Sequence, residues 1–580
     1  MPTRGVLSPL MWNLVVDSLL RTVQQDLGIY IQGYADDIAL LVTGPCVGTA
    51  CGLIQRALKE VERWCEETGL SVNPTKTEMV LFTRKVKQEG FRSPSLYGER
   101  LKRSSEVKLL GVVLDSKLTW DEHIRQTCRK AMANFWQCRR TVGQTWGLAP
   151  KTMHWIYSMI IRPRISYAAV IWWRRTQLLT AQRQLDKVQR LACLCMTGVM
   201  RTTPTAALEF MLNIRPLWLH VQGEALASCY RLEQMGAWGR GDIEVGHSLI
   251  RKVLRDTVQA SLLPSDLMPP EYRFNKAFQV KIPTREDWLK GPVVHGPDTR
   301  AVFTDGSFLD NQAGAGVYLG EEPGGPNLRI PMGRWTTVTQ AELMAILAAA
   351  ELEELASCPE RALVIYSDSQ AALLALKSPV INSKLVKQCV LALEKLAERK
   401  ELQLSWVPGH SGIAGNEGAD VLAKEAALTP FAGPEPALGI SVRTWKSKLK
   451  TWSTQAHQEY WEGLGTCRQA KEIMGLSLDP RKAKGLLNCS KKQLHVFASA
   501  LTGHCNLNKH LFVLGLVVDP TCPLCLEEEE SALHLLAECP ALMSLRSRVV
   551  GAATLTAADL WHLSWADLYT LIKGSGRFRV

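Results

Sequence analysis

The segment Ala301-Val302-Phe303-Thr304-Asp305-Gly306-Ser307 begins the part of the sequence that decides the fold. It is a short apolar run that ends in a carboxylate and a turn residue, which is typical of a β-strand and its exit. Three later segments each offer one carboxylate in a comparable place. They are Thr339–Ala345, which opens a predicted helix, Leu363–Ser369, which is a further apolar strand, and Gly415–Asp420, at the start of the last predicted helix.

The four carboxylates belong to Asp305, Glu342, Asp368 and Asp420, in a β-β-α-β-α pattern. Acids at strand ends and helix starts can converge on one edge of an α/β sheet. Grouped carboxylates repel each other and raise each other's pKa values unless a cation neutralises them. Mg²⁺ is a hard ion that takes carboxylate oxygens, and two such ions about 4 Å apart can promote phosphodiester hydrolysis. We therefore expect a site for two Mg²⁺ ions, with Mn²⁺ as a substitute.

Each acid also has a purely structural interpretation. Glu342 follows Thr339 by three residues and fits a capping box, and Asp305 fits an ordinary turn at a strand end. Asp368 fits a helix N-cap, and Asp420 fits a solvated acid in the first turn of a helix. Taken singly, these interpretations are favoured over metal binding. The order of all four acids together favours the metal site.

These segments resemble a type 1 ribonuclease H domain. The resemblance rests on TDGS at 304–307, GAGV at 314–317, AEL at 341–343 and SDS at 367–369, and on the tail from Trp406 to Gly412 that leads to Asn416. It implies that the four acids bind two Mg²⁺ ions and that His410, on a loop flanked by glycines, assists proton transfer or product release. Histidine suits proton transfer near neutrality.

The resemblance also implies a mixed five-stranded sheet and hydrolysis of the RNA strand of RNA–DNA hybrids. Between Ser378 and Lys400 the sequence predicts only one helix, so we expect no extra basic substrate-binding helix. Selectivity for a hybrid requires contacts to 2′-hydroxyl groups of the RNA. We expect these contacts from Gly306, Ser307, Gln340 and Asn416.

A second signal lies near the start of the sequence. Gly33-Tyr34-Ala35-Asp36-Asp37 stands between two apolar runs, which predicts a hairpin with two acids at its tip. Such acids are costly unless they are solvated or bind metal. Together with 5–13, 69–77 and 107–115, this segment resembles the palm of a reverse transcriptase from a jockey-like non-LTR retrotransposon. The resemblance implies that Asp36 binds metal beside Asp37 and that Lys76 follows the palm helix.

The palm departs from the family pattern in two places. Pro2-Thr3-Arg4-Gly5 stands where the family usually has Pro-Gln-Gly-Gly, and the further metal-binding aspartate, expected upstream, is missing from the sequence. We therefore expect a partial palm without fingers, in a truncated chain. RNA-directed DNA polymerase activity is not expected from it alone.

The region from 121 to 290 is predicted to be helical and basic, and by resemblance it is a thumb and connection. Trp136, Trp146, Trp155, Trp172 and Trp173 are interleaved with its charges. Such a region can follow a nucleic-acid backbone and stack on bases. The alternative, a helical bundle with core tryptophans, is slightly favoured for these residues. The stretch 264–297, rich in proline and charge, is expected to be a linker.

A third signal is the spacing C-x2-C-x8-H-x4-C near the end of the chain. Cys522, Cys525, His534 and Cys539 would supply three thiolates and one imidazole, which suits a closed tetrahedral Zn²⁺ site. The alternative is an acidic helical hairpin with incidental cysteines. The segment resembles the Cys/His segment near the end of the same retrotransposon polyproteins. Should a ligand fail, His504 and His510 are nearby substitutes.

The 580 residues carry a net charge of +12, which is unevenly distributed. Residues 298–430 contain 11 Lys and Arg against 17 Asp and Glu, so the remainder carries 57 against 39. An acidic nuclease domain would then rely on its basic neighbours to hold RNA, DNA or their hybrid. The alternative is a basic surface that only confers solubility.

Other features of the sequence restrict the class of protein. No apolar run is long enough to span a membrane, the start lacks the shape of a signal peptide, and the sixteen cysteines fit reduced thiols. We expect an intracellular protein, nuclear or cytoplasmic, that needs no small-molecule cofactor.

Two alternatives to an active nuclease stay open. The rival hypothesis is a nucleic-acid-binding remnant without catalysis, and the third is a genomic relic without a cellular role. The expected class is a multidomain α/β and α+β protein with a partial palm (1–120), a helical thumb and connection (121–290), a ribonuclease H domain (298–428) and a basic, mostly helical region (440–580) that holds the zinc segment (522–539).

Overall fold

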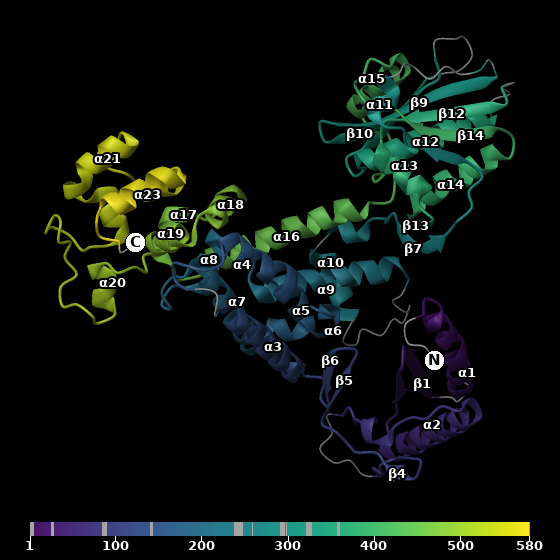
Figure 1. Ribbon diagram of the computed structural model, residues 1–580, viewed down its shortest axis with the longest axis horizontal. Helices are drawn as coiled ribbons and strands as arrows, with labels where there is room; N and C mark the ends of the chain where they lie inside the picture. Colours follow the sequence, from purple (N-terminus) through teal and green to yellow (C-terminus); the bar gives the residue numbers. More distant parts are fainter. Residues whose placement is uncertain are drawn as a thin grey trace. The chain divides into compact units, whose positions relative to one another are not determined.

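The computed structural model describes residues 5–578 except 25–27, 84–89, 140–142, 237–247, 258, 290–295, 297, 321–326 and 356–359 (Figure 1). The chain separates into two compact units, described here one at a time. The first comprises Met1–Gln137 with Gln177–Val188, and the second comprises Cys138–Thr176 with Gln189–Val580. Most of the Pro2–Gly5 segment lies outside the described residues.

The first unit is built around the predicted hairpin, β1 (Ile29–Tyr34) and β2 (Asp37–Val42), which turns at Ala35 and Asp36. Its buried side packs against α1 (Ser8–Gln24) and α2 (Val47–Thr68). The α2 helix ends at Gly69, whose φ of 67° fits the left-handed conformation common after helices. The remaining elements are η1 (Pro74–Lys76), β3 (Ser95–Leu96), β4 (Glu99–Arg100), β5 (Glu106–Leu109), β6 (Val112–Asp115) and α3 (Asp121–Arg139).

The second unit begins with short helices that resolve the two interpretations of the tryptophans. Trp172 and Trp173 are buried core residues, whereas Trp146 and Trp155 are more than half exposed. In the first unit Trp136 is also exposed. Core packing therefore accounts for two of the five tryptophans. The helical elements are α4 (Pro150–Ile156), η2 (Tyr157–Ile161), α5 (Arg162–Ile165), α6 (Ala169–Trp172), η3 (Trp173–Gln177), α8 (Thr205–Met211), α9 (Leu217–Gln234), α10 (Ser248–Thr257) and η4 (Gln259–Leu262). Helix α7 (Leu179–Thr197) is divided between the units, its residues up to Val188 belonging to the first.

The centre of the second unit is a mixed six-stranded sheet of order β11-β10-β9-β12-β14-β8. The first three strands are antiparallel, and β9, β12, β14 and β8 run parallel. The strands are β8 (Gln279–Lys281), β9 (Thr299–Leu309), β10 (Gln312–Tyr318), β11 (Leu328–Gly333), β12 (Ala362–Ser367) and β14 (Glu401–Trp406). The helices around them are α12 (Val338–Leu355), α13 (Gln370–Lys377), α14 (Lys384–Ala397) and α15 (Ala414–Leu428). As expected, α14 is the one helix between Ser378 and Lys400, a stretch that is described throughout.

Two glycines show that α12 and α15 cover opposite faces of this sheet. A Cβ on Gly306 would lie 2.5 Å from the Glu342 nitrogen of α12, and one on Gly316 would lie 2.5 Å from the Ala419 oxygen of α15. Gly316 pairs across the ladder with Asp305, the neighbour of Gly306. Neighbouring residues of a strand point to opposite faces, so the two helices lie on opposite sides. Both approach β9 and β10 closely because these strands lack side chains there.

The expectation of a linker from 264 to 297 is wrong for its first part, which contributes a strand to the sheet and raises the strand number from five to six. The β8 strand pairs with β14, and β7 (Leu267–Tyr272) pairs with β13 (Val380–Ser383). Phe278 is 5% exposed within the core of the sheet, and Lys276 donates from Nζ to the Ser378 oxygen at 2.7 Å. Helix α11 (Arg285–Leu289) follows, and most of the rest of the expected linker lies outside the described residues.

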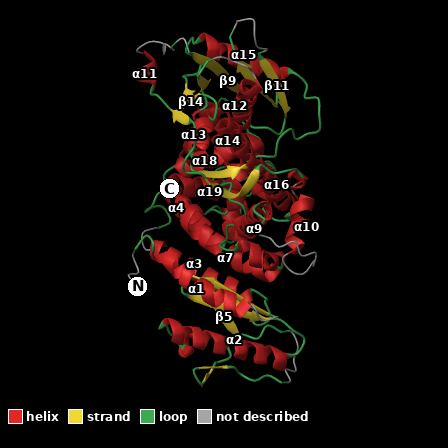
Figure 2. Ribbon diagram, turned by 90° about the vertical axis from the view of Figure 1, so that its right-hand side faces the viewer, coloured by secondary structure: helices red, strands yellow, loops and turns green. Residues whose placement is uncertain are grey.

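After the sheet the chain is mainly helical (Figure 2). Before these helices the chain passes beside Asp266, whose backbone nitrogen donates to the Ile440 oxygen at 3.0 Å. No helix in the described part of the chain is long and apolar enough to cross a membrane. The elements are α16 (Val442–Gly463), α17 (Arg468–Met474), α18 (Pro480–Asn488), α19 (Lys491–Thr502), α20 (Asn508–Val513), η5 (His534–Glu538), η6 (Pro540–Leu542), α21 (Met543–Val550), α22 (Ala557–His562) and α23 (Trp565–Gly574).

Candidate active site

Three of the four predicted acids meet at the carboxyl end of β12, beside β9, in the middle of the six-stranded sheet. Asp305 lies in β9, Glu342 in the first turns of α12, and Asp368 directly after β12. Each offers a carboxylate oxygen, and these oxygens lie within 4.8 Å of one another. Asp305 and Glu342 are nearly buried, with 5% and 4% of their surfaces exposed. The parallel pairing of Ser367 with Thr304 brings the end of β12 beside Asp305. Asp305 lies within β9, which continues to Leu309, so the prediction that it ends a strand at a turn is wrong.

Glu342 is not part of a capping box. The box that starts α12 is formed by Thr337 and Gln340: the Gln340 nitrogen donates to Thr337 Oγ1 at 3.3 Å, and the Thr337 nitrogen donates to Gln340 Oε1 at 3.2 Å. Glu342 instead accepts a hydrogen bond from the backbone of Gly306. The Gly306 backbone also hydrogen-bonds the Asp305 carboxylate. Gly306 therefore joins strand and helix at the site.

The cap of the helix after Asp368 is also a neighbouring residue. Ser369 caps α13 by accepting from the Ala372 nitrogen at 3.3 Å, so the N-cap interpretation of Asp368 is wrong. Asp420 lies beyond the first turn of α15, whose first-turn acid is Glu417. The structural interpretations of three of the four acids therefore apply to their neighbours.

The three clustered acids resist ionisation. Burial, followed by repulsion from Asp368 and Asp420, raises the pKa of Asp305 to about 7. Burial, followed by repulsion from Asp305, holds the pKa of Glu342 well above its ordinary range. Burial also raises the pKa of Asp368, although the charge of His410 opposes this effect. A divalent cation would reverse these shifts by neutralising the carboxylates.

Asp420 belongs to an adjacent group with His410 and Glu417, whose ligand atoms also lie within 4.8 Å of one another. Lys424 Nζ lies 2.6 Å from Asp420 Oδ2 and forms an ion pair with it. Sequence reasoning missed Glu417 and Lys424. The signal was the spacing on α15, since residues three before and four after Asp420 share its helix face.

Small residues allow α15 and the His410 loop to reach the site. Gly314 and Gly316 of β10 lie against the α15 backbone, where any side chain would collide with it. A Cβ on Gly409 would lie 2.5 Å from Asp368 Oδ2, so the loop passes directly over this carboxylate. His410 itself is exposed, with a φ of 52°.

The four predicted substrate contacts have different surroundings. Gln340 is 4% exposed, its Oε1 accepts within the capping box, and its Nε2 donates to the Gly439 oxygen at 2.8 Å. This amide is engaged within the protein, and its predicted contact with substrate stays a prediction. Asn416 is buried, and its side chain hydrogen-bonds Asp368. Gly306 is buried, and Ser307 is half-buried.

Two further observations bear on whether the site fits a metal ion. Asn416 Oδ1 is buried without a hydrogen-bond partner beside the acids. Ser367, which sequence reasoning also missed, is fully buried and donates from Oγ to Glu342 Oε2 at 3.4 Å. Clustered carboxylate oxygens held by such second-layer groups are the donor set that Mg²⁺ and Mn²⁺ prefer. The residues therefore fit these ions.

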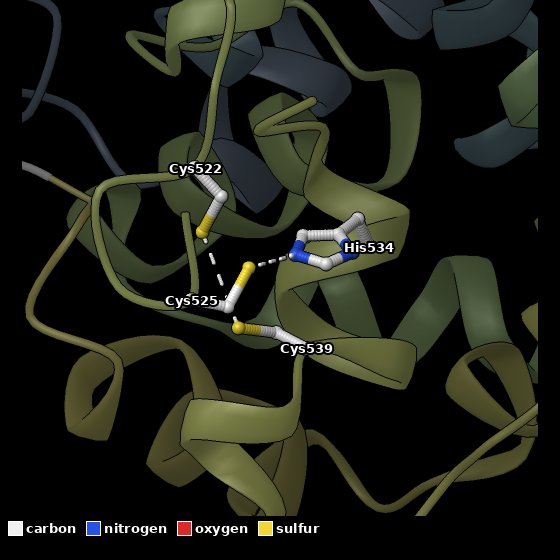
Figure 3. A group of neighbouring side chains, drawn as sticks. All are labelled: Cys522, Cys525, His534 and Cys539. Atoms are coloured by element: carbon white, nitrogen blue, oxygen red, sulfur yellow. Dashed lines mark hydrogen bonds between the residues drawn. The ribbon is translucent and has the colours of Figure 1, made fainter. Parts of the chain in front are cut away.

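The predicted zinc ligands form a second cluster at the end of the chain (Figure 3). Cys522 Sγ lies 4.0 Å from Cys539 Sγ, and Cys525 Sγ lies 3.4 Å from His534 Nε2. A tetrahedral Zn²⁺ ion with its usual bond lengths would separate two sulfurs by roughly 3.8 Å, and a sulfur from a nitrogen by roughly 3.6 Å. The observed spacings fit a four-coordinate site without an open position.

The surroundings of this cluster also favour zinc. The backbone amides of Glu527 and Glu528 lower the pKa of the Cys525 thiol to about 6. Glu528 Oε2 lies 3.2 Å from His534 Nδ1 without forming a hydrogen bond to it, and Nε2 faces the sulfurs. His504 and His510, the predicted substitutes, contact each other with ring centroids 4.7 Å apart and are not in the cluster.

The predicted polymerase residues lie in the first unit. Asp36 and Asp37 are exposed at the hairpin tip, and Lys76 is exposed at the end of η1. Within the part of the chain that the structure describes, these aspartates belong to no group of three metal-type ligands. Their predicted roles remain predictions.

Two family models match the chain. The model "Reverse transcriptase (RNA-dependent DNA polymerase)" covers residues 1–114, and the model "RNase H" covers residues 297–428. A solved ribonuclease H1 from the archaeon Halobacterium salinarum is 26% identical, covers 22% of this chain and 96% of its own, and has a TM-score of 0.19.

The curated relatives include retrotransposon proteins and a ribonuclease H1. A Pol polyprotein of the R1 retrotransposable element of Nasonia vitripennis is 24% identical over 42% of this chain and 71% of its own length. A putative protein of the Drosophila melanogaster R1DM element is 26% identical over 40% of this chain and 22% of its own length. Human ribonuclease H1 is 35% identical over 22% of this chain and 50% of its own length. The chain thus spans less than two thirds of the last two relatives.

Proposed function

We propose that this chain, a relative of R1- and jockey-type retrotransposon polyproteins with a reverse transcriptase segment and a ribonuclease H domain, hydrolyses the RNA strand of RNA–DNA hybrids with Mg²⁺. The proposal rests on one observation above all. Asp305, Glu342 and Asp368 hold carboxylate oxygens within 4.8 Å of one another at the edge of the ribonuclease H sheet. Because burial and mutual repulsion disfavour their charges, the site favours divalent cations.

Asp305, Glu342 and Asp368, joined by Asp420, would hold two Mg²⁺ ions. Bound there, the ions would supply Lewis-acid activation of a water and charge neutralisation at the scissile phosphate. The protein positions the acids: Gly306 fixes Glu342, Asn416 binds Asp368, and Lys424 holds Asp420. Catalysis of this kind depends mainly on such positioning and on electrostatic stabilisation.

His410 would move protons between the site and solvent. Its imidazole is exposed, and its charge acts on Asp368, beneath the same loop. Ser307 follows Asp305 and Gly306 on β9 and is only half-buried. Its hydroxyl can therefore hydrogen-bond a 2′-hydroxyl, which is the group that distinguishes RNA from DNA.

Cys522, Cys525, His534 and Cys539 would hold one structural Zn²⁺. The cluster contains four ligands and no open position, which is the pattern of structural rather than catalytic zinc. Cys539 and His534 are buried, so the ion would link the loop from Cys522 to the short helices that follow. Its loss is expected to unfold this segment.

Nucleic-acid binding without hydrolysis is the second candidate. It is favoured by the charge distribution, since the residues outside 298–430 carry 57 Lys and Arg against 39 Asp and Glu. Such binding would weaken steeply with salt concentration. It would also persist when the acids of the nuclease site are changed.

The proposal is tested with the full chain and an RNA–DNA hybrid labelled on its RNA strand. Wild type should cleave with Mg²⁺ or Mn²⁺, and Asp305→Asn should lose this activity because it removes a cation ligand. Asp310→Asn is a matched control. Asp310 is an exposed acid at the turn between β9 and β10, and asparagine tolerates its φ of 46°. Cleavage by Asp305→Asn would refute the assignment. Salt-sensitive binding by a folded wild type without cleavage would favour the second candidate.

A further inference from the structure

Arg546 is a charged side chain in the interior of the C-terminal region. It lies in α21 and is fully buried, with 0% of its surface exposed. Its Nε donates to the Ala553 oxygen at 2.6 Å, and its Nη2 donates to the Cys539 oxygen at 2.7 Å. Its Nη1 is buried without a hydrogen-bond partner. The guanidinium is therefore held by backbone carbonyls, which carry no charge that balances its own.

No carboxylate compensates this buried charge directly. Glu538 acts on Arg546 but is exposed to solvent, and no acid among the described residues forms an ion pair with Arg546. A second arginine near the zinc-type ligands, Arg577, has a partner of its own. Its Nη2 lies 3.0 Å from Oε2 of Glu530, which is fully buried. Because a buried charge without a counter-charge is strongly destabilising, Arg546 requires an anion in its surroundings.

The predicted zinc ligands can supply this anion. They are three thiols and one imidazole, from Cys522, Cys525, Cys539 and His534 (Figure 3). Burial lowers the pKa of Arg546, and the Cys539 thiolate opposes this effect more than Glu538 does. Arg546 and the Cys539 sulfur are therefore near enough to interact.

The charge of the loaded cluster matches that of the arginine. Thiols lose their protons when they bind zinc. Three thiolates and a neutral imidazole around one dication leave a single excess negative charge. One guanidinium without a partner carries a single positive charge. The match exists only with the metal bound, because three clustered thiolates without a cation repel one another.

We infer that Arg546 is the counter-charge of the zinc cluster, and that it raises the affinity of the four ligands for Zn²⁺. The inference rests on the zinc site proposed above and adds to it a fifth residue, which does not touch the ion. It is independent of hybrid hydrolysis. Arg546 also donates to the backbone of Cys539, so its charge and its hydrogen bond must be tested separately.

The test measures the zinc affinity of the full chain. Co²⁺ bound by thiolates gives a charge-transfer absorption band, and loss of this band during titration with Zn²⁺ gives Kd. Arg546→Met removes the charge but keeps much of the buried volume, and it should weaken zinc binding roughly 10- to 100-fold, as for other groups behind metal ligands. Arg548→Met is the matched control, since Arg548 is exposed on the same helix.

Two more variants separate the charge from the hydrogen bond. Arg546→Lys keeps the charge and should retain most of the affinity, whereas Arg546→Gln keeps a donor without a charge and should behave like Arg546→Met. Affinity restored by glutamine and not by lysine would overturn the inference, because the hydrogen bond alone would then account for it.

A change in the charge of the cluster itself gives an independent test. Cys525 is the least buried of the four ligands, and Cys525→His replaces one thiolate by a neutral imidazole, so that the loaded cluster is uncharged. In this background Arg546→Met should no longer weaken zinc binding. An equal loss in both backgrounds would overturn the inference, since packing does not depend on the charge of the cluster.

The same titrations distinguish failure of the inference from failure of the zinc site. Wild-type affinity in Arg546→Met would overturn the counter-charge and leave the zinc site intact. Absence of the thiolate band in the wild type would overturn both.

Discussion

Asp305→Asn should stabilise the nuclease domain while abolishing its function. The pKa of Asp305 rises to about 7 from an ordinary value of 3.8, because the carboxyl is buried beside Asp368 and Asp420. In the unfolded chain this group ionises near pH 4. Between about pH 4 and pH 7 the folded state therefore binds more protons than the unfolded state, so the domain loses stability as pH rises.

The magnitude follows from the size of the pKa change. A pKa that rises from 3.8 to about 7 corresponds to about 4 kcal/mol at pH 8. The repulsive part is shared with Asp368 and Asp420, so we expect about 2 kcal/mol of local stabilisation from Asp305→Asn. At pH 5 the effect should be less than half as large, because the folded carboxyl is then mostly protonated.

Hydrogen–deuterium exchange of peptides from β9 and α12, in EDTA, measures this effect. Wild type and Asp305→Asn are compared at each pH, so that intrinsic exchange rates cancel. The variant should exchange roughly 30-fold more slowly at pH 8, as expected for about 2 kcal/mol. Added Mg²⁺ should protect the wild type and not the variant. Faster exchange in Asp305→Asn at pH 8, or an equal effect of Asp310→Asn, would refute the claim that burial and repulsion at Asp305 destabilise the fold.

Three further changes test the fold around the sites. Phe278→Ala should destabilise the nuclease domain by about 3–5 kcal/mol, because this buried side chain anchors β8; unchanged thermal unfolding would restore the linker interpretation. Gly306→Ala should lower hydrolysis about 100-fold, because its Cβ would lie 2.5 Å from the Glu342 nitrogen and displace the helix; wild-type kcat would contradict this. Cys539→Ala should reduce bound zinc from one ion per chain to none by elemental analysis, and retained zinc would exclude the proposed ligand set.

The sequence was most informative where chemistry lies at the ends of regular elements. Glu342 and Asp368 were predictable because the first opens a helix and the second follows a strongly patterned strand. Asp305 was recognised by the apolar run before it, although β9 continues beyond it to Leu309. The spacing of Cys522 to Cys539 also predicted a cluster that the structure brings together. Local sequence carries this information, because the ligands come from a few short segments.

What sequence reasoning missed depended on contacts between distant segments. The three-residue strand β8 is defined by pairing with β14, more than a hundred residues later. The hydrogen bond from Gln340 to the Gly439 oxygen was also not predictable, because it joins residues 99 positions apart in the sequence. The exposure of Trp155 and the burial of Trp172 also depend on tertiary packing, because both lie in apolar, basic surroundings in the sequence.

The most direct test of the nuclease assignment follows both strands of an RNA–DNA hybrid in one reaction. The full chain is incubated with a hybrid whose RNA and DNA carry different labels, with Mg²⁺ or with EDTA, beside duplex RNA and duplex DNA. We predict that only the RNA of the hybrid is cut, only with the metal, and not by Asp305→Asn. Cleavage of the DNA strand or of duplex RNA, or an intact hybrid in the presence of folded protein and Mg²⁺, would contradict the assignment.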